Sequence, residues 1–362
     1  MCTGVALHRM RIEENKQLAP LTTLGIGGPA RWFVSAESEA DVVEAAAWAR
    51  EAGTPLFVLG GGSNLLIADQ GFDGVVLHIA LKGIHVQEGT TGSDERVYSV
   101  AAGEDWDRLV QRTVDDDCAG LECLAGIPGT AGGTPVQNVG AYGQEVSSVI
   151  DRVRVFDLHE QVFGEFSASE CGFAYRHSRF NTADRGRHAV TRVDCRLKLH
   201  GAPTLKYADL QKTFTPNSNP TLQEVAATVR RIRQSKGMLI VDGDPDSRSA
   251  GSFFKNPIMT EEQVSSVAST AGAEPPRFPA GVEREGSVKL PAAWLLEKAG
   301  FTKGYTLGRA GISSKHTLAL VNRGGATAAE IMALADKIRD AVERKFGIQL
   351  HMEPVLLGFE KA

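Results

Sequence analysis

The stretch that most constrains the fold is GIPGTAGGTPVQNVGAYG, residues 126–143, which contains six glycines, two prolines and no charged side chain. Glycine permits positive φ and lets the backbone approach a ligand that a Cβ would keep away. Pro128 and Pro135 stiffen the segment because proline fixes φ. An interdomain linker is the alternative, but linkers are enriched in charge and serine, whereas Ile127 and Tyr142 indicate burial. We favour a rigid loop that presents backbone groups to a ligand.

Length and composition indicate a globular protein with more than one domain. At 362 residues the chain exceeds the usual size of a single hydrophobic core, so two or three domains are expected. A net charge of −5, without a basic run carrying interleaved aromatics, argues against nucleic-acid binding. The sequence has no run of 18 apolar residues and no signal-peptide core, so we expect a cytoplasmic protein with no membrane partner.

The cysteines and histidines show no metal-binding spacing. Cys2, Cys118, Cys123, Cys171 and Cys195 include no CxxC pair, and the nine histidines form no HExxH motif. This pattern indicates neither a zinc site nor a disulfide framework. Buried, reduced thiols and no bound metal are therefore expected.

Periodicity and capping signals predict alternating strands and helices in the first two hundred residues. A helix is expected after Ser38, with acidic residues in its first turn and Gly53 beyond its end. Another is expected at 105–114. The predicted strands are 31–36, 56–59, 65–67, 75–79, 153–158 and 189–199.

Helical signals dominate beyond residue 200. Capping boxes predict helices that begin after Thr221, Thr260 and Thr327 and end near 236, 272 and 346. A fourth helix is expected at 291–299, and strands are expected at 318–322 and 348–359. This mixture predicts an α+β fold with a domain boundary near 200–215.

A second glycine-rich loop, GGGSN at residues 60–64, follows the strand predicted at 56–59. Consecutive backbone N–H groups in such a loop can form an anion nest. Neither a Walker loop nor a GxGxxG fingerprint fits, because no GK[ST] follows and the next element is a predicted strand. A hairpin turn is the alternative, but three glycines and an asparagine exceed what a hairpin needs. A pyrophosphate loop is preferred.

Three further segments place one polar side chain among small or apolar neighbours. In FAYRHSRF, Arg176 needs an anionic partner, either an internal carboxylate or a substrate carboxylate. In SAGSFFKNP, Ser252 is taken from this stretch alone as a turn residue, and the absence of GxSxG disfavours an acyl-enzyme serine. Glu353 would share a strand face with Val355 and other apolar residues, which indicates either a structural ion pair or a functional carboxylate.

Taken together, these segments resemble the UDP-N-acetylenolpyruvoylglucosamine reductase (MurB) family, flavoenzymes that complete UDP-N-acetylmuramate in peptidoglycan synthesis. The likeness extends from about Asn15 to Phe359. Any single segment is modest evidence, whereas the set in family order is highly specific. The segments are TTLGIGGPA, GGGSNLL, GIPGTAGGTPVQNVGAYGQE, FAYRHSRF, SAGSFFKNP and GSVKL with AWLLE.

The resemblance implies a vanillyl-alcohol-oxidase/PCMH-type FAD-binding domain over about 25–202, with lobes at 20–85 and 86–205, and a substrate-binding C-terminal domain at 210–362. It implies non-covalent FAD, with the pyrophosphate on GGGSN and the isoalloxazine along residues 126–143. The implied cofactor contacts are Gly60, Gly61, Gly62, Ser63, Asn64, Gly126, Ile127, Pro128, Gly129, Gly132, Gly133, Asn138, Gly140, Ala141 and Tyr142.

The resemblance also implies the chemistry. NADPH would reduce FAD, and UDP-N-acetylglucosamine enolpyruvate would then be reduced in the same cleft. Arg176 and Glu353 match the residues that stabilise the enolic intermediate, and Ser252 matches the proton donor. The implied substrate contacts are Tyr175, Tyr207, Lys236, Asn256, Lys289 and His316. Tyr207 matches the tyrosine that closes over the nucleotide in one subclass.

One departure and two rival functions bear on this interpretation. GMLIVDGDPDSR, which follows Lys236, differs from the Lys-x-x-Pro pattern of many members, which puts the Lys236 contact in question. A flavin oxidase on the same fold commonly tethers FAD through a histidine beside the pyrophosphate loop, where this chain has Ser63 and Asn64. A non-catalytic sugar-nucleotide sensor would not need the catalytic trio. We expect a monomer that acts on small molecules.

Overall fold

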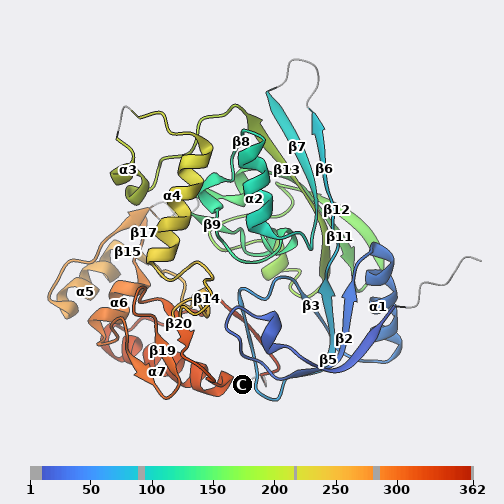
Figure 1. Cartoon of the computed structure of the whole chain (residues 1–362). Coiled ribbons are helices and arrows are strands. Elements are labelled where there is room, and N and C mark those ends of the chain that lie inside the picture. Colours follow the sequence, from blue (N-terminus) through green and yellow to red (C-terminus); the bar gives the residue numbers. More distant parts are fainter. Residues whose placement is uncertain (1–9, 89–93, 216–217, 280–285, 360–362) are drawn as a thin grey trace, which may run out of the picture. The chain divides into compact units, whose positions relative to one another are not determined.

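The computed structural model describes residues 10–88, 94–215, 218–279 and 286–359 (Figure 1). The chain forms two compact units. The first comprises Met1–Lys16, Pro29–Gly61 and Phe72–Val229, and the second comprises Gln17–Gly28, Gly62–Gly71 and Arg230–Ala362. Two short segments from the first seventy residues therefore fold with the C-terminal part. The functional domain bounds expected from the resemblance stay a prediction.

The first sheet of the first unit has the strand order β1 (Ile12–Gln17), β2 (Pro29–Ala36), β5 (Phe72–Ile79) and β3 (Leu56–Leu59). Strands β2, β5 and β3 run parallel. Helix α1 (Glu39–Glu51) lies against β2 and β5 (Figure 1). Ser38 and Asp41 form the predicted helix start as a reciprocal capping box.

The second sheet of this unit is antiparallel. Helix α2 (Trp106–Asp115) begins after Asp105, whose carboxylate accepts a hydrogen bond of 2.9 Å from Arg108 N. Buried side chains such as Val153 and Val193 alternate with charged ones. The strand order is β12 (Val162–Ser167), β11 (Ile150–Asp157), β13 (His188–Leu199), β7 (Glu95–Ala101) and β6 (Ile84–Glu88), and β8 (Cys118–Ala119) also pairs with β13.

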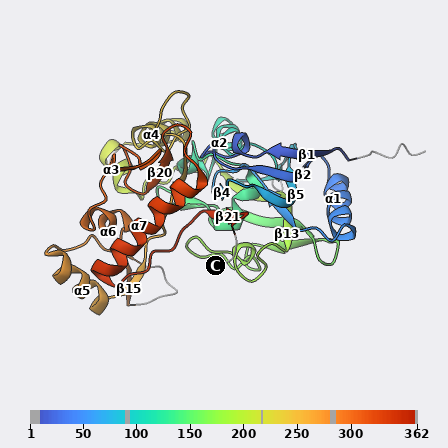
Figure 2. The ribbon, with the colours of Figure 1, turned by 90° about the horizontal axis from the view of Figure 1, so that it is seen from below.

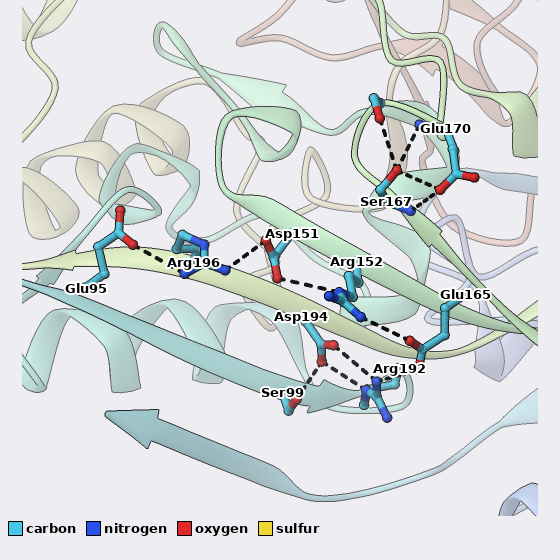
Figure 3. Close-up of polar contacts among 11 residues, drawn as sticks. Glu95, Ser99, Asp151, Arg152, Glu165, Ser167, Glu170, Arg192, Asp194 and Arg196 are labelled. Carbon is cyan, nitrogen blue, oxygen red and sulfur yellow. Dashed lines mark hydrogen bonds and ion pairs between the residues drawn. The ribbon is translucent and has the colours of Figure 1, made fainter. Parts of the chain in front are cut away.

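A network of charged side chains, here called the charged sheet face, crosses β7, β13, β11 and β12 (Figure 3). Its members are Glu95, Ser99, Asp151, Arg152, Glu165, Arg192, Asp194 and Arg196. Arg196 lies between Glu95 and Asp151, at N–O distances of 3.3 and 3.0 Å. Arg192 bonds Glu165 at 2.8 Å and Asp194 at 2.9 Å. Arg196 therefore links carboxylates from the two strands that flank β13, whereas Arg192 links a carboxylate of its own strand to one on β12, two strands away.

The second unit is built around helix α7 (Ala328–Phe346), the long helix prominent in Figure 2. Its apolar stripe, which includes Ile331, Leu334 and Ile338, is fully buried in one core. The other helices of its C-terminal part are α5 (Glu261–Ala271) and α6 (Ala292–Lys298). Its four-stranded sheet has the order β14 (Ser249–Ser252), β20 (Ala319–Asn322), β19 (Ala310–Ile312) and β18 (Thr306–Leu307).

Short pairings complete the second unit. Strand β4 (Leu65–Ile67) runs parallel to β21 (Val355–Leu357), which places Leu66 in the same core as α7. Strands β15 (Ile258–Thr260), β17 (Ser287–Lys289) and β16 (Phe278–Pro279) form a small antiparallel sheet. Helix α3 (Ala208–Thr213) belongs to the first unit, and α4 (Leu222–Ser235) begins in the first unit and ends in the second.

All six helices predicted from local signals form, but one predicted strand is largely wrong. Of residues 348–359 only Val355–Leu357 is a strand. Met352 makes an isolated bridge to Phe254, and Pro354, which has no N–H to donate, interrupts the pairing before β21. Glu353 therefore lies in a break rather than on a continuous strand face.

The four cysteines of the described ranges are buried, free thiols, as expected: Cys118, Cys123, Cys171 and Cys195. Cys2 lies outside these ranges. Among the helices that the structure describes, none has the length and apolarity needed to span a bilayer.

Candidate active site

The two glycine-rich loops predicted from the sequence meet inside the first unit. A Cβ added to Gly61 would lie 2.5 Å from the Cα of Gly129, so only glycine fits there. A Cβ on Gly60 would lie 3.1 Å from Thr130 Oγ1. The first half of the GGGSN loop therefore packs directly against the backbone of residues 126–143, which we call the glycine-rich loop.

The glycine-rich loop is bonded to the segment between β7 and α2. Ala131 N donates to Glu104 O and Gly132 N donates to Ala102 O, both at 2.9 Å. A Cβ on Gly132 would lie 2.5 Å from the Cβ of Ala102. These contacts exclude the linker interpretation, because a linker would not be bonded residue by residue to its own domain.

The hydroxyl of Thr130 is buried and has no hydrogen-bond partner among the described residues. A buried polar group without a partner costs roughly 1–3 kcal/mol. Such an atom, next to backbone that only glycine can form at Gly61 and Gly129, is suited to an acceptor on a bound ligand. Thr130 was missed by the sequence interpretation, because nothing in a lone threonine distinguishes an unsatisfied hydroxyl from a capped one.

The second half of the GGGSN loop belongs to the second unit. Gly62 has φ of 60°, and a Cβ there would collide with the carbonyl oxygen of Leu21. Asn64 Nδ2 donates to Glu353 O at 3.2 Å, and Asn64 O accepts from Val355 N at 3.0 Å. The hairpin alternative for this loop is wrong, because β3 and β4 belong to different sheets.

Ser252 and Glu353 are neighbours within the second unit. Ser252 is the last residue of β14, opposite Ala319, and so ends a strand rather than lying in a turn. Glu353 N donates to Phe253 O at 2.9 Å. The rings of Phe253 and Phe254 are buried, with centroids 5.5 Å apart. The backbone thus brings the predicted proton donor close to the predicted carboxylate, beside an apolar core.

Arg176 lies at the tip of a hairpin in the first unit. Its φ is 52°, and its Nη2 donates to Gly140 O at 2.8 Å. A Cβ on Gly140 would lie 2.7 Å from Glu145 Cγ and 2.9 Å from Gln144 O, which explains the glycine, and 3.4 Å from Nη1. The guanidinium also lies 5.3 Å from the ring centroid of Tyr175. These contacts attach Arg176 to the glycine-rich loop. 

Tyr207 is also beside this loop. Its ring packs edge-on against Tyr142, with centroids 5.2 Å apart, and it is 41% exposed. It precedes α3 as the N-cap residue. Its role of closing over the nucleotide stays a prediction.

The remaining predicted substrate contacts lie at or beyond the end of α4, in the second unit. Burial, followed by the positive charges of Lys236 and Lys303, lowers the pKa of His316 to about 4, so the imidazole is neutral at pH 7. Asn256 Oδ1 accepts from Ala292 N at 2.9 Å, at the start of α6. Lys289 is in β17, opposite Ile258.

The segment that departs from the family pattern is anchored beside His316. Asp246 accepts hydrogen bonds from Ser314 N at 2.8 Å and from Ser314 Oγ at 2.6 Å. Asp244 pairs with Lys315 Nζ at 2.6 Å, and this contact lowers the pKa of the Asp244 carboxyl. The DGDPD sequence at residues 242–246 therefore joins the chain after Lys236 to the turn that carries His316.

Three of the predicted residues are thus grouped by contacts in the second unit (Asn64, Ser252 and Glu353), and three in the first (Gly61, Gly140 and Arg176). The roles assigned to these residues, and the assembly of the two groups around one substrate, stay predictions.

Comparisons with known proteins match two parts of the chain to described domains. Residues 244–357 match the C-terminal domain of UDP-N-acetylenolpyruvoylglucosamine reductase, and residues 30–162 match an FAD binding domain. A UDP-N-acetylenolpyruvoylglucosamine reductase from Streptomyces coelicolor is 49% identical over 94% of this chain and 89% of its own length. The enzyme of that name from Thermobifida fusca is 44% identical over 95% and 97%.

A solved structure is similar over nearly the whole chain. The UDP-N-acetylenolpyruvylglucosamine reductase (MurB) from Thermus caldophilus superposes with a TM-score of 0.64 at 27% identity. The match covers 96% of this chain and 100% of that one.

Proposed function

The chain belongs to the UDP-N-acetylenolpyruvoylglucosamine reductase (MurB) family, and on that premise we propose that it reduces UDP-N-acetylglucosamine enolpyruvate to UDP-N-acetylmuramate, with NADPH as the reductant. The family consists of oxidoreductases of peptidoglycan-precursor synthesis, and FAD is the cofactor of the domain matched at residues 30–162. Net reduction of the vinyl group adds one hydride equivalent and one proton.

The packing of Gly60 and Gly61 on Gly129 and Thr130 is the observation that carries this proposal. It forms a backbone surface without side chains, next to the unsatisfied Thr130 hydroxyl, and both features fit a flavin dinucleotide. When bound, FAD supplies the hydride chemistry, while the protein binds and orients. The GGGSN loop would hold the pyrophosphate, and residues 126–143 would line the ring system. The loop has no histidine, so attachment would be non-covalent.

Arg176 would clamp the substrate carboxylate. Its Nη2 is held by Gly140 O, which fixes the plane of the guanidinium. A planar fork in fixed orientation binds a carboxylate in two places and stabilises the negative charge that develops on it. Glu353, protonated or bridged by a proton, would assist at the enolic oxygen.

Ser252 would deliver the proton to the carbon next to the carboxylate. A hydroxyl is a weak acid, so it needs a strongly basic enolic carbon and fixed geometry. Its position at the end of β14, one residue before the Phe253 carbonyl that binds Glu353 N, supplies that rigidity. Tyr175, Tyr207, Lys236, Asn256, Lys289 and His316 would contact the rest of the substrate.

A visible absorption spectrum with an NADPH oxidation assay tests the proposal. The expected protein is yellow, releases its flavin on acid precipitation, and oxidises NADPH over repeated turnovers only when the enolpyruvyl substrate is present. Oxygen-dependent turnover of an alcohol would favour a flavin oxidase instead. Substrate binding without NADPH oxidation would favour a sugar-nucleotide sensor. We further propose a cytoplasmic monomer with the predicted domain bounds.

A further inference from the structure

The hairpin that carries Arg176 has its own backbone pairing. Ala174 N donates to His177 O at 3.1 Å, and His177 N donates to Ala174 O at 3.0 Å. This arrangement places Tyr175 and Arg176 at the turn, with Arg176 in the left-handed region. The pairing defines the shape of the hairpin but not its position relative to the glycine-rich loop. Residues 174–177 are called the Arg176 hairpin below.

The side chain of Asn138 joins the Arg176 hairpin to the glycine-rich loop. Asn138 is 1% exposed, and its Nδ2 donates to Ala174 O and to Glu145 Oε2, both at 3.0 Å. Its Oδ1 accepts from Ser147 N at 3.1 Å. Both amide protons are therefore engaged inside the protein. Any contact from Asn138 to a cofactor would come from its backbone.

The backbone of Asn138 also faces Arg176. Its carbonyl oxygen lies 3.5 Å from Nη1, while the neighbouring Gly140 O accepts from Nη2 at 2.8 Å. One residue thus sets both the position of the hairpin, through Ala174, and part of the orientation of the guanidinium. A second attachment, Ser178 Oγ to Val136 O at 2.7 Å, connects the residues next to the hairpin to the same loop.

We infer that Asn138 is a positioning residue for Arg176, a role that rests on the proposed function of Arg176 as the substrate carboxylate clamp. The hydrogen bonds of the Asn138 side chain are to Glu145, Ala174 and Ser147. This side chain bonds Ala174 O of the Arg176 hairpin and so holds the hairpin against the glycine-rich loop. In that position the Gly140 carbonyl oxygen accepts from Nη2 and orients the guanidinium. Because a displacement of about 1 Å can slow an oriented reaction by about 10²-fold, loss of this joint affects rate more than binding.

Asn138→Gly is the appropriate variant. Asn138 has φ of 44°, a conformation that glycine adopts without strain, so the substitution removes the side chain and leaves the backbone acceptable. Asn15, with φ of 52° in β1, offers a matched control, Asn15→Gly, outside both loops. We expect N138G to slow flavin reoxidation by the enolpyruvyl substrate at least about tenfold. Reduction by NADPH and the substrate Kd would change by less than about twofold, and N15G would alter none of them.

A double-mutant cycle with Arg176→Lys separates positioning from a general structural role. If Asn138 acts through Arg176, adding N138G to R176K causes little further slowing. If the rate of the double variant falls by the product of the two single-variant factors, the losses are additive in free energy and the inference is wrong. The inference is also wrong if N138G slows both half-reactions equally. Should N138G fail to fold or to hold FAD, Ser178→Ala removes the separate attachment to Val136. It must then show the same non-additivity, or the inference is wrong.

The same cycle distinguishes this inference from the proposed function. Normal turnover of R176K would overturn the role of Arg176 and, with it, the role of Asn138. A slow R176K combined with a normal or additive N138G would overturn only the positioning role.

Discussion

The charged sheet face and the glycine-rich loop belong to the same unit, but they differ in how their polar groups are partnered. On the sheet, the guanidinium groups of Arg192 and Arg196 each bond two carboxylates, at 2.8 to 3.3 Å (Figure 3). The loop has no charged residue of its own and packs backbone on backbone at Gly61 and Gly129. It also contains the hydroxyl of Thr130, which has no hydrogen-bond partner in the part of the chain that the structure describes.

This difference separates stability from function. A polar group that is satisfied inside the protein contributes to folding, or costs nothing, whether or not a ligand is bound. A buried group without a partner lowers stability until a ligand satisfies it. Substitutions on the sheet face should therefore change stability alone, and substitutions at the loops should change ligand binding or rate.

The largest effect is expected from Ser252→Ala, a hydroxyl of the second unit whose predicted role is also toward a ligand. Loss of a general acid slows its step by roughly 10²–10⁴-fold. Stopped-flow absorbance should show slow flavin reoxidation by substrate and normal reduction by NADPH. Ser252→Cys, with a more acidic thiol, should recover part of the loss. Equal slowing of both steps would mean that Ser252 positions the flavin or its loop instead.

A pair of arginines gives the next largest effect. Arg176→Lys replaces a planar fork with a point charge and should lower the rate of substrate reduction by about 10–10²-fold, the equivalent of about 1.5–3 kcal/mol. The matched sheet variant, Arg192→Lys, should leave turnover unchanged and cost about 1 kcal/mol of unfolding free energy or less. Steady-state kinetics and urea unfolding of both variants measure the contrast. If R176K lowers the free energy of unfolding but leaves the rate of substrate reduction unchanged, the expected contrast between the two arginines is wrong.

Two threonines test the contrast at smaller scale. Thr130→Val should weaken FAD binding by about 2–10-fold, from one hydrogen bond of about 0.5–1.5 kcal/mol, and leave the apoprotein at least as stable. Thr191 is buried and donates to Glu39 Oε1 at 2.8 Å, so Thr191→Val should destabilise the protein without changing FAD affinity. Flavin fluorescence titration and thermal unfolding report the two effects. Unchanged FAD affinity in T130V would leave its hydroxyl without a ligand role.

The smallest effect is expected on the sheet. Arg196→Gln removes two ion pairs at a side chain that is 45% exposed, so the loss should be within about 1 kcal/mol. Because solvent screens exposed charges, the difference from the wild type should shrink at high salt. Urea unfolding at low and high ionic strength checks it. A large, salt-independent loss would show that the face is more than a set of surface pairs.

Local signals predicted the helices better than the strands: six of the seven described α-helices were expected, whereas strands such as β6, β7 and β12 were not. The hydroxyl of Thr327 and the carboxylate of Glu330 are three residues apart, and they form the expected capping box at the start of α7. The family and the fold class, α+β with a vanillyl-alcohol-oxidase/PCMH-type FAD-binding domain, are also confirmed. The order of the motifs along the chain is sufficient to predict the family and the fold class, because the residues of each motif are close together in the sequence.

Contacts between distant segments could not be predicted in the same way. Residues 62–71 join the second unit because β4 pairs with β21, some 290 positions later in the chain. Glu353 does not lie on the strand predicted at 348–359, because Met352 makes only an isolated bridge and Pro354 interrupts the strand pairing. Neither the β4–β21 pairing nor the break at Glu353 can be predicted from neighbouring residues alone, because strand pairing depends on packing with segments distant in the sequence.

The sequence by itself therefore determined the helix starts, the two glycine-rich loops and the family, because capping, positive φ and motif order are properties of neighbouring residues. The tertiary structure alone decided that Gly61 packs on Gly129, that Thr130 is left unsatisfied, and that Asn138 holds the Arg176 hairpin. Each of these depends on atoms brought together from separate segments. Side-chain type sets what a residue can bond, and only folding selects the partner.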